Sequence, residues 1–263
     1  MDQAEVMVSE LMKVGLPSKG MLYGDKLPDG VLHVRPLSTR EEKMLISSRV
    51  RSGQLMYDIV SGCIRSEDKV KMPFEQYLVG DVVYLFLMIR TATYGADYMF
   101  MPSCKYCQKP IKIEIRVPYD LGIYVLEPGF SEPFETVLPV SKKKLGLRLF
   151  RIADEQDVQN YEKVRENRGE ENPGYVYRIA KHIVNVGGNP YPIEEACEFV
   201  ERLHARDTEA IREAIINVDC GVDLQLERQC EGCGRVNDVF FEFTPDFFRS
   251  NNARVRRRRG TVG

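Results

Sequence analysis

The sequence has 263 residues, and its composition is ordinary for a chain that buries a core: 43% of the residues are hydrophobic and 29% are charged. The formal net charge of −2 excludes a general electrostatic attraction to nucleic acid or to anionic membranes. The longest apolar run, residues 82–89, is far shorter than the roughly 20 residues that cross a bilayer. Asp2, Glu5 and Glu10 near the start do not fit a secretory signal, so none is expected.

The first residues predict a short amphipathic helix over 1–14, followed by a turn. Gly15 and Gly20 have the spacing of a phosphate-binding loop, but Met21 and Leu22 occupy the positions that need Lys and Ser or Thr. We therefore expect a turn here and no nucleotide site.

Residues 30–37 predict a strand, and residues 38–51 predict the helix that follows it. Ser38 or Thr39 would cap this helix. Glu41 stands in the capping-box position, where a carboxylate also complements the helix dipole.

Further along, residues 55–63 predict a second helix. Residues 74–93 give the strongest helical pattern, with apolar residues at spacings of three and four. Because that helix is apolar over most of its circumference, we expect it at the centre of the fold. Residues 135–151 predict a hairpin, which an acidic helix over 154–168 follows. This order of elements repeats that of residues 30–51 and suggests a reused unit.

The segment 118–139 is punctuated by proline and glycine and is expected to be extended. Helices are predicted over residues 175–185, 193–204 and 207–217, with Asp207 as the N-cap of the last one. The chain thus alternates short strands with helices along most of its length.

Four of the seven cysteines form two Cys-x-x-Cys pairs, Cys104 with Cys107 and Cys230 with Cys233. Alternating apolar residues flank each pair, which places each pair at the tip of a hairpin. A tight turn that offers two thiolates is half of a tetrahedral zinc site. Two such turns would supply four sulfur ligands and close the coordination. We therefore predict one structural zinc ion (Zn2+), held by these four residues.

Other uses of the paired cysteines fit the sequence less well. A redox Cys-x-x-Cys normally begins a helix, whereas strands are expected after both pairs and Pro110 would interrupt a helix after the first. A disulfide framework suits small secreted chains. The remaining cysteines, Cys63, Cys197 and Cys220, are expected as buried thiols in a reducing compartment.

These patterns predict an α+β fold in which one or more helical domains carry short β-hairpins and a split four-cysteine module like a zinc ribbon. The long separation of the two cysteine pairs makes the segment between them an insertion. We divide the chain into an N-terminal strand-plus-helix region (1–97), a first zinc knuckle (98–118), an inserted hairpin and helical region (119–220), a second zinc knuckle (221–249) and a basic tail (250–263).

No set of residues predicts catalysis, so an enzyme is not expected. His33, His182 and His204 are scattered and lack a partner motif, which favours a structural role for each. The acidic clusters at 41–42 and 154–157 fall in first helical turns, where capping explains them.

The arginine-rich run 254–259 has no interleaved aromatic residues and therefore does not predict recognition of bases. A solvated tail, a tail that docks on an acidic neighbour and a nucleic-acid contact all fit it. The pair Phe247–Phe248 just before it could anchor the C-terminus in a groove of a partner.

Two motifs carry a family resemblance: Leu-Pro-Ser-Lys-Gly-Met-Leu-Tyr at 16–23, and Val-Arg-Pro-Leu-Ser-Thr-Arg-Glu-Glu-Lys-Met-Leu at 34–45. The acidic helix start at 154–157 and the closing Cys-x-x-Cys-Gly with its Phe-Phe pair are similar too. Together they resemble the baseplate-hub and hub-assembly proteins of T4-like contractile-tailed bacteriophages. The resemblance implies a non-enzymatic component of the virion, in the tail baseplate, made in the host cytoplasm. It also implies that the partners are other baseplate and tail proteins in a multi-subunit assembly.

The alternative is a zinc-ribbon protein that binds nucleic acid or acts in transcription. Against it, the cysteine turns carry few basic residues beyond Lys105, Lys109 and Arg235, and the net charge is near zero. We therefore favour a structural or assembly protein, with neither nucleic acid nor a membrane-spanning segment expected.

Overall fold

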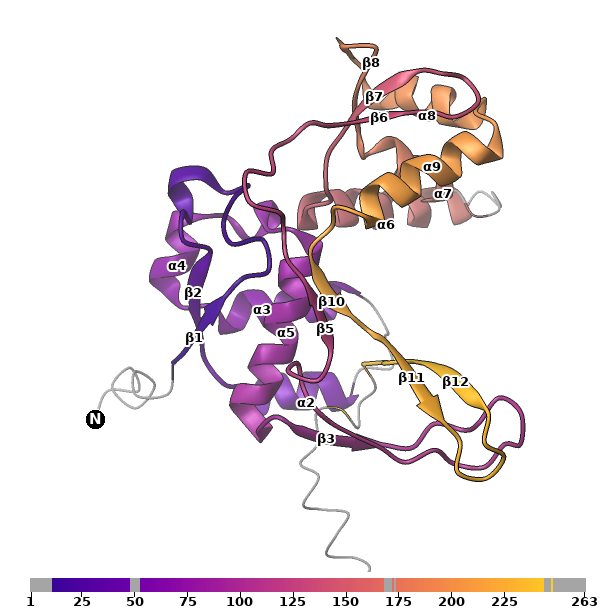
Figure 1. Cartoon of the computed structure of the whole chain (residues 1–263). Coiled ribbons are helices and arrows are strands. Elements are labelled where there is room, and N and C mark those ends of the chain that lie inside the picture. Colours follow the sequence, from indigo (N-terminus) through magenta and orange to yellow (C-terminus); the bar gives the residue numbers. More distant parts are fainter. Residues whose placement is uncertain (1–10, 48–52, 168–171, 173, 244–246, 248–263) are drawn as a thin grey trace, which may run out of the picture.

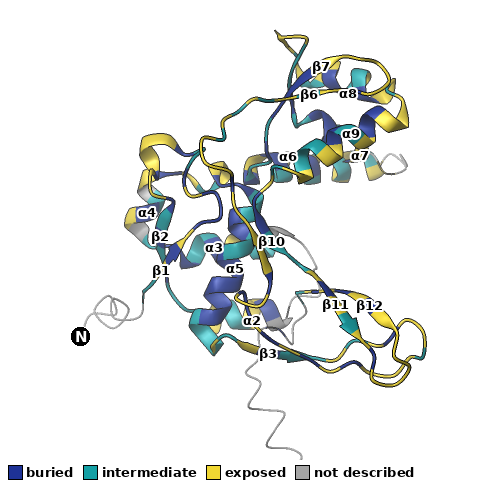
Figure 2. Ribbon diagram, viewed as in Figure 1, coloured by how far each residue is buried: buried dark blue, intermediate teal, exposed yellow. Residues whose placement is uncertain are grey.

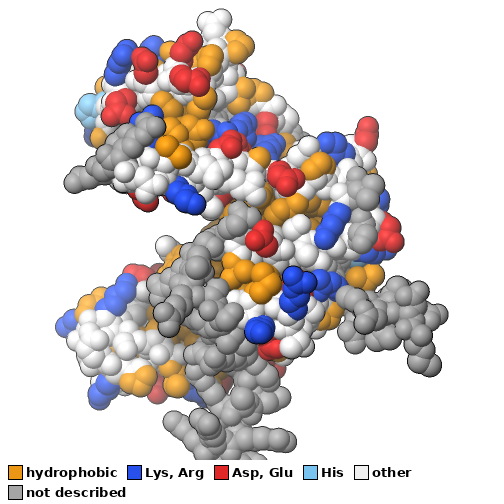
Figure 3. Space-filling model, turned by 180° about the vertical axis from the view of Figure 1, so that it is seen from behind, with side chains coloured by type: hydrophobic (Ala, Val, Ile, Leu, Met, Phe, Trp, Pro, Cys, Tyr) orange, Lys and Arg blue, Asp and Glu red, His pale blue; other side chains and the backbone are white. Residues whose placement is uncertain are grey.

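Two groups of helices and a projecting pair of hairpins make up the fold (Figure 1). The computed structural model describes residues 11–47, 53–167, 172, 174–243 and 247. Its helices and short antiparallel strands confirm the predicted α+β fold. Seen from behind in Figure 3, the second group of helices and the hairpins stand apart, with a notch between them.

The N-terminal half begins with a hairpin whose strands pair from Met12↔Val34 to Gly15↔Val31. After two helices, an isolated antiparallel bridge joins Val34 to Ile64. The elements in order are β1 (Met12–Gly15), the 3-10 helix η2 (Gly24–Lys26), β2 (Val31–Val34), α2 (Thr39–Ser47), α3 (Gly53–Cys63), α4 (Ser66–Lys71), the 3-10 helix η3 (Phe74–Gln76), α5 (Val79–Tyr94), β3 (Asp97–Phe100) and β4 (Ile113–Arg116).

Helix α5 lies at the centre of this half, as its apolar pattern predicts. Val82 and Ile89 are at most 1% exposed, and Figure 2 shows the helix buried along most of its length. It begins at Val79, later than predicted. The reason is that Leu78 is extended (φ −64°, ψ 143°) and forms a β-bridge with Arg151 of the other half.

The C-terminal half follows the same order of elements. Its hairpin pairs Phe134↔Leu147, and Leu147 then pairs with Ile183, as Val34 does with Ile64. The elements are β5 (Gly122–Tyr124), β6 (Phe134–Val137), β7 (Lys144–Leu147), α6 (Ile152–Glu166), α7 (Gly174–Ala180), β8 (Ile183–Val186), β9 (Asn189–Pro190), α8 (Ile193–Glu201), α9 (Ala205–Ile216), β10 (Gly221–Asp223), β11 (Gln225–Gln229) and β12 (Val236–Phe240).

The sheet β6-β7-β8-β9 and helices α7 to α9 enclose a core of their own in this half. A second and larger core joins the N-terminal helices to both cysteine hairpins. Strand β5 pairs with β10, so the segment 118–139 is partly extended, as predicted. We call residues 12–116 the N-terminal repeat and residues 134–240 the C-terminal repeat. The two hairpins β3–β4 and β11–β12 together form the cysteine arm.

Three local predictions are wrong. Residues 12–14 of the predicted first helix belong to strand β1, while residues 1–10 lie outside the described part of the chain. The helix predicted over 175–185 ends at Ala180, because β-branched residues and the left-handed Gly187 and Gly188 favour the hairpin β8–β9 instead. Helix α9 begins before Asp207, and its N-cap is His204.

An arginine directly after the second strand of each repeat clamps the helix that follows. Arg35 donates from Nη1 and Nη2 to the two carboxylate oxygens of Glu41 at 2.8 and 2.6 Å. Arg148 donates likewise to Asp154, at 2.6 Å for both bonds. Each carboxylate also accepts the backbone N–H three residues before it, which confirms the predicted capping role.

A buried aspartate in the last long helix of each repeat holds the loop of the opening hairpin. Asp81 accepts the Ser18 N–H at 2.9 Å and a tyrosine hydroxyl of the same loop. Asp207 accepts the N–H groups of Val140 and Ser141 at 2.7 and 2.9 Å. Both aspartates are the third residue of their helix, so the two repeats match in their polar contacts as well as in their element order.

Candidate metal centre

The first cysteine turn closes the hairpin β3–β4, as predicted. An antiparallel bridge between Ser103 and Pro110 extends the hairpin to its tip. Cys104 donates its N–H to the Lys109 carbonyl at 2.8 Å, and its own carbonyl accepts the Gln108 N–H at 3.0 Å. These bonds fold the four residues of Cys-x-x-Cys into a tight loop that presents both sulfurs on one side.

The second cysteine turn, between β11 and β12, has the same construction. Cys230 donates its N–H to the Arg235 carbonyl at 2.9 Å, and its carbonyl accepts the Gly234 N–H at 2.7 Å. The residue after the second cysteine is left-handed in both turns, with φ of 61° at Gln108 and 72° at Gly234. Each repeat therefore ends in the same two-thiol turn.

The structure brings the four predicted cysteines together. Cys104 Sγ lies 3.7 Å from Cys233 Sγ, and Cys107 Sγ lies 3.6 Å from Cys230 Sγ. All four sulfurs lie within 4.8 Å of one another, and all four residues are free cysteines. Zinc–sulfur bonds of about 2.3 Å in a tetrahedron would separate sulfurs by about 3.8 Å, close to these distances. The cluster is thus near enough to hold one metal ion.

The surroundings of Cys104 favour a thiolate. Burial raises the pKa of this thiol, but the N–H groups of Cys107 and Tyr106 that point at the sulfur outweigh it and hold the pKa at about 6. The Lys109 N–H lowers the pKa of Cys107, while burial and hydrogen bonds between its protonated thiol and the neighbouring cysteines raise the pKa to about 11.

Asn237, which is 2% exposed, ties the two turns together. Its Oδ1 accepts the Lys105 N–H of the first turn at 2.9 Å, and its Nδ2 donates to the Arg235 carbonyl of the second turn at 3.1 Å. Sequence reasoning missed this residue, since its place on β12 shows no signal beyond a polar residue at an inward position of the strand.

An aromatic cluster joins the arm to the N-terminal repeat. Phe241 packs edge-on against Tyr98 and Phe100, with ring centroids 5.6 and 5.5 Å apart. Phe247 is fully buried among these rings, where it also contacts Arg90. The prediction that Phe247 anchors a partner is therefore wrong, because it packs inside its own chain; Phe248 lies outside the described residues.

The predicted structural histidines lie on different elements. His33 Nδ1 is 3.3 Å from Asp68 Oδ2, and His204 accepts the Arg206 N–H as the cap of α9. His182 Nδ1 lies 2.7 Å from the carbonyl oxygen of Arg148, and burial lowers the pKa of the His182 ring to about 4. Each ring thus has a local structural contact.

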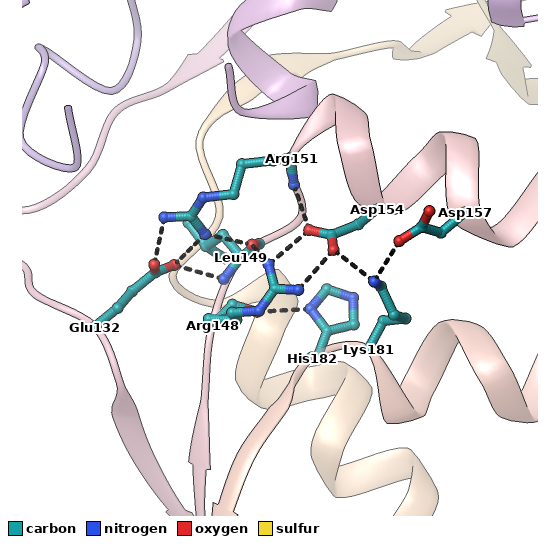
Figure 4. Close-up of polar contacts among 8 residues, drawn as sticks. All are labelled: Glu132, Arg148, Leu149, Arg151, Asp154, Asp157, Lys181 and His182. Carbon is teal, nitrogen blue, oxygen red and sulfur yellow. Dashed lines mark hydrogen bonds and ion pairs between the residues drawn. The ribbon is translucent and has the colours of Figure 1, made fainter. Parts of the chain in front are cut away.

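A polar network lies where the two repeats meet (Figure 4). Arg151 pairs with Glu132, whose Oε1 also accepts the Leu149 N–H at 2.6 Å. Lys181 lies beside Asp154 and Asp157 at 3.2 and 2.7 Å. A cavity of about 380 Å³ adjoins this network. The charged groups drawn in Figure 4 neutralise one another, which gives the network a structural role at the junction.

Two matching loops in the sequence carry a signal for the polar contacts that the repeats share. Leu-Pro directly follows the first strand of both repeats, at 16–17 and 138–139, and Lys19 and Lys142 in these loops both have positive φ. The loop that follows Leu-Pro in each repeat is the one that the buried aspartate holds.

Fold and cluster together define a two-repeat α+β protein with a four-thiol centre assembled from both repeats. Within the described residues, no helix is long and apolar enough to cross a membrane. A model of the family described as T4 bacteriophage base plate protein matches residues 22–249, a span that contains all four cysteines of the centre. The chain therefore belongs to this family of phage baseplate proteins. No curated protein and no solved structure was found to match it.

Proposed function

We propose that the chain is a non-enzymatic structural or assembly component of the baseplate hub, stabilised by one structural zinc ion and acting through contacts with other tail proteins. Membership of the baseplate family supports a place in the virion tail. The observation that carries the proposal is the thiol cluster, which unites Cys104 and Cys107 of one repeat with Cys230 and Cys233 of the other.

Zinc is the metal that best suits this centre. Four sulfur donors at near-tetrahedral spacing favour zinc over the hard cations, which prefer oxygen. Four protein ligands leave no position for water or substrate, which is the arrangement of structural sites. An ion there would pin the ends of both repeats to each other and so fix the arm as a rigid projection for partners.

Elemental analysis of protein purified without chelator tests the metal. We expect about one zinc per chain, as a closed four-thiolate site requires. Cys104→Ser and Cys233→Ser should each lose it, whereas Cys197→Ser, outside the cluster, should keep it. Absence of metal in the unaltered protein, or an equal loss in the Cys197 variant, would contradict the proposal.

Co-expression with the other baseplate proteins of the same phage tests the hub role. We expect the chain to co-purify with hub proteins and to appear with them in isolated baseplates. Recovery only with peripheral baseplate proteins would overturn the hub assignment and leave family membership intact. The Cys104→Ser variant then shows whether the arm takes part, since losing the metal should reduce recovery of the partners.

One observation favours the zinc-ribbon alternative. The Arg235 guanidinium lies 4.8 Å from the centre of the exposed Tyr106 ring at the tip of the arm, a pairing that can stack on nucleic acid bases. Anisotropy titrations with single- and double-stranded DNA at low and high salt address it. Tight, salt-sensitive binding that Tyr106→Ala abolishes would support a nucleic-acid role.

A further inference from the structure

The two repeats are joined by a short backbone pairing. Val79 donates its N–H to the Phe150 carbonyl at 3.2 Å, and Ile152 donates its N–H to the Tyr77 carbonyl at 3.0 Å. Between these bonds an antiparallel bridge links residues 78 and 151. Segment 77–79 of the N-terminal repeat thus forms an antiparallel backbone pairing with segment 150–152 of the C-terminal repeat.

Each of these segments has a counterpart in the other repeat. Segment 203–205 corresponds to 77–79, because His204 and Leu78 are the N-caps of equivalent helices and have nearly the same backbone angles, φ −66° and ψ 142° against φ −64° and ψ 143°. Segment 37–39 corresponds to 150–152, because each lies between the clamping arginine and the carboxylate that it holds.

These two counterparts do not pair with each other. Ser38, Thr39, His204 and Ala205 are exposed. Within the described part of the chain, the N–H groups of Thr39 and Ala205 and the carbonyls of Leu37 and Leu203 have no hydrogen-bond partner. They are the counterparts of the two donors and two acceptors that pair at the internal junction.

Charged side chains flank both free segments. Helix α2, which begins at residue 39, exposes Arg40 and Lys43 in its first turns. Helix α8, which ends just before segment 203–205, exposes four glutamates along its length: Glu194, Glu195, Glu198 and Glu201. At the internal junction α6 lies against η3, and the counterparts of these two elements are α2 and the end of α8. A copy docked in the same way would bring Arg40 at the start of α2, whose first turn also carries Glu41 and Glu42, to Glu201 at the end of α8, which Arg202 follows.

We propose that a second copy of the chain binds head to tail, with its segment 37–39 pairing to segment 203–205 of the first copy. The outer segments carry Thr39 and His204 where the internal junction has the buried Ile152 and Leu78. The contact therefore buries less apolar surface, so it forms reversibly and depends on concentration. A head-to-tail contact is heterologous, and it generates rings or open chains.

A proline substitution tests the backbone pairing without breaking the helix. Ala205 is the first residue of α9, a position that favours proline, and His204 already has the extended backbone that a following proline requires. Ala205→Pro removes the N–H that would donate to the second copy, and we expect it to weaken association roughly tenfold, as the loss of one backbone bond implies. Ala205→Ser retains the N–H and serves as the matched control.

Sedimentation velocity over a wide range of concentrations is the measurement. The unaltered full-length chain and Ala205→Ser should gain mass together as concentration rises, and Ala205→Pro should lag behind them. The proposal is overturned if the chain stays monomeric at every concentration, or if Ala205→Pro leaves its association unchanged.

Charge reversal tests the head-to-tail geometry separately. Arg40→Glu and Glu201→Lys should each weaken association, because each places like charges at one contact. An equimolar mixture of the two variants should recover pairing, since the altered ends of the two chains then attract each other. Failure of the mixture to recover, with both variants folded by circular dichroism, would exclude this pair of surfaces as the contact.

Discussion

The N-terminal repeat and the C-terminal repeat use the same contacts in different surroundings. Both have an arginine clamp, a loop-holding aspartate and a two-thiol turn. Helix α5 is packed on most sides, whereas its counterpart α9 leaves Ile216 73% exposed. Asp81 on α5 is fully buried, and burial raises the pKa of its carboxyl to about 6. The two repeats thus share their polar contacts, whereas the degree of burial, which differs between them, sets the pKa and the stability contribution of each contact.

The largest expected effect comes from breaking the centre that both repeats share. Cys104→Ser and Cys230→Ser should lower the free energy of unfolding by similar amounts, on the order of 5 kcal/mol, because structural metal binding is coupled to folding. Thermal unfolding with and without chelator measures this. Chelator should destabilise the unaltered chain and leave the two variants unchanged. Unequal losses would mean that one turn holds its shape without the metal.

The arginine clamps come next. Arg148→Met should lower the free energy of unfolding by about 3 kcal/mol, because it leaves the buried Asp154 with less positive charge beside it. Arg35→Met should cost about 1 kcal/mol, since Glu41 is more exposed and its charge is screened by solvent. Urea unfolding of both variants tests this order, and a reversed order would contradict the role given to burial.

The arginine clamps also predict that the folded state loses stability at low pH. Burial raises the pKa of Glu41, but Arg35 and the Ser38 N–H outweigh it and lower the pKa to about 2 from the ordinary 4.5. The folded state therefore binds this proton more weakly than the unfolded state does. The stabilisation is complete above pH 4.5 and is lost as the pH falls towards 2. In Arg35→Met this part of the acid dependence should shrink, because only the Ser38 groups would still lower the pKa of Glu41.

The loop-holding aspartates should respond to pH in opposite directions. Because burial raises the pKa of Asp81 to about 6 from 3.8, the folded state binds this proton more tightly than the unfolded state, and the resulting stabilisation is complete below pH 3.8 and is lost as the pH rises through 6. Burial raises the pKa of Asp207 too, but two N–H groups outweigh it and lower the pKa, so its stabilisation is present at neutral pH. Asp207→Asn should lose about 1 kcal/mol at neutral pH. Asp81→Asn should lose less.

Urea unfolding of both asparagine variants at about pH 4 and about pH 7 tests this contrast, because these two pH values lie on either side of the raised pKa of Asp81. The difference between Asp81→Asn and the unaltered chain should shrink or change sign at the higher pH. Asp219, whose pKa burial also raises to about 6, titrates in the same range, so Asp219→Asn is the control. If the stability change of Asp81→Asn and that of Asp207→Asn varied with pH in the same direction, the proposed difference between the two aspartates would be wrong.

Elements with a strong local pattern were predictable from the sequence. The hairpins at both cysteine pairs, the central helix α5 and the capping carboxylates all follow from periodicity and spacing. The hairpin β8–β9 was not, because Ile183 to Val186 reads equally well as the end of a helix until Leu147 pairs with it. The meeting of the cysteine pairs was inferred from metal chemistry, whereas Asn237 between them depends on tertiary packing alone. The predicted domain boundaries stay predictions.

The smallest expected effect is in the two cysteine turns, which use different residues for the same backbone conformation. Gln108 has φ of 61° and Gly234 has φ of 72°. A Cβ at position 234 would meet no atom within 4 Å, so Gly234→Ala should cost only the left-handed strain, about 1 kcal/mol. Gln108→Gly should relieve that strain in the folded state but free the unfolded chain, which leaves a change of roughly 0.5 kcal/mol or less. Chemical unfolding at saturating zinc measures both. If Gly234→Ala also lowered the zinc affinity while Gln108→Gly did not, the two turns would not contribute equally to the metal, and the symmetry between the repeats would end at their backbone.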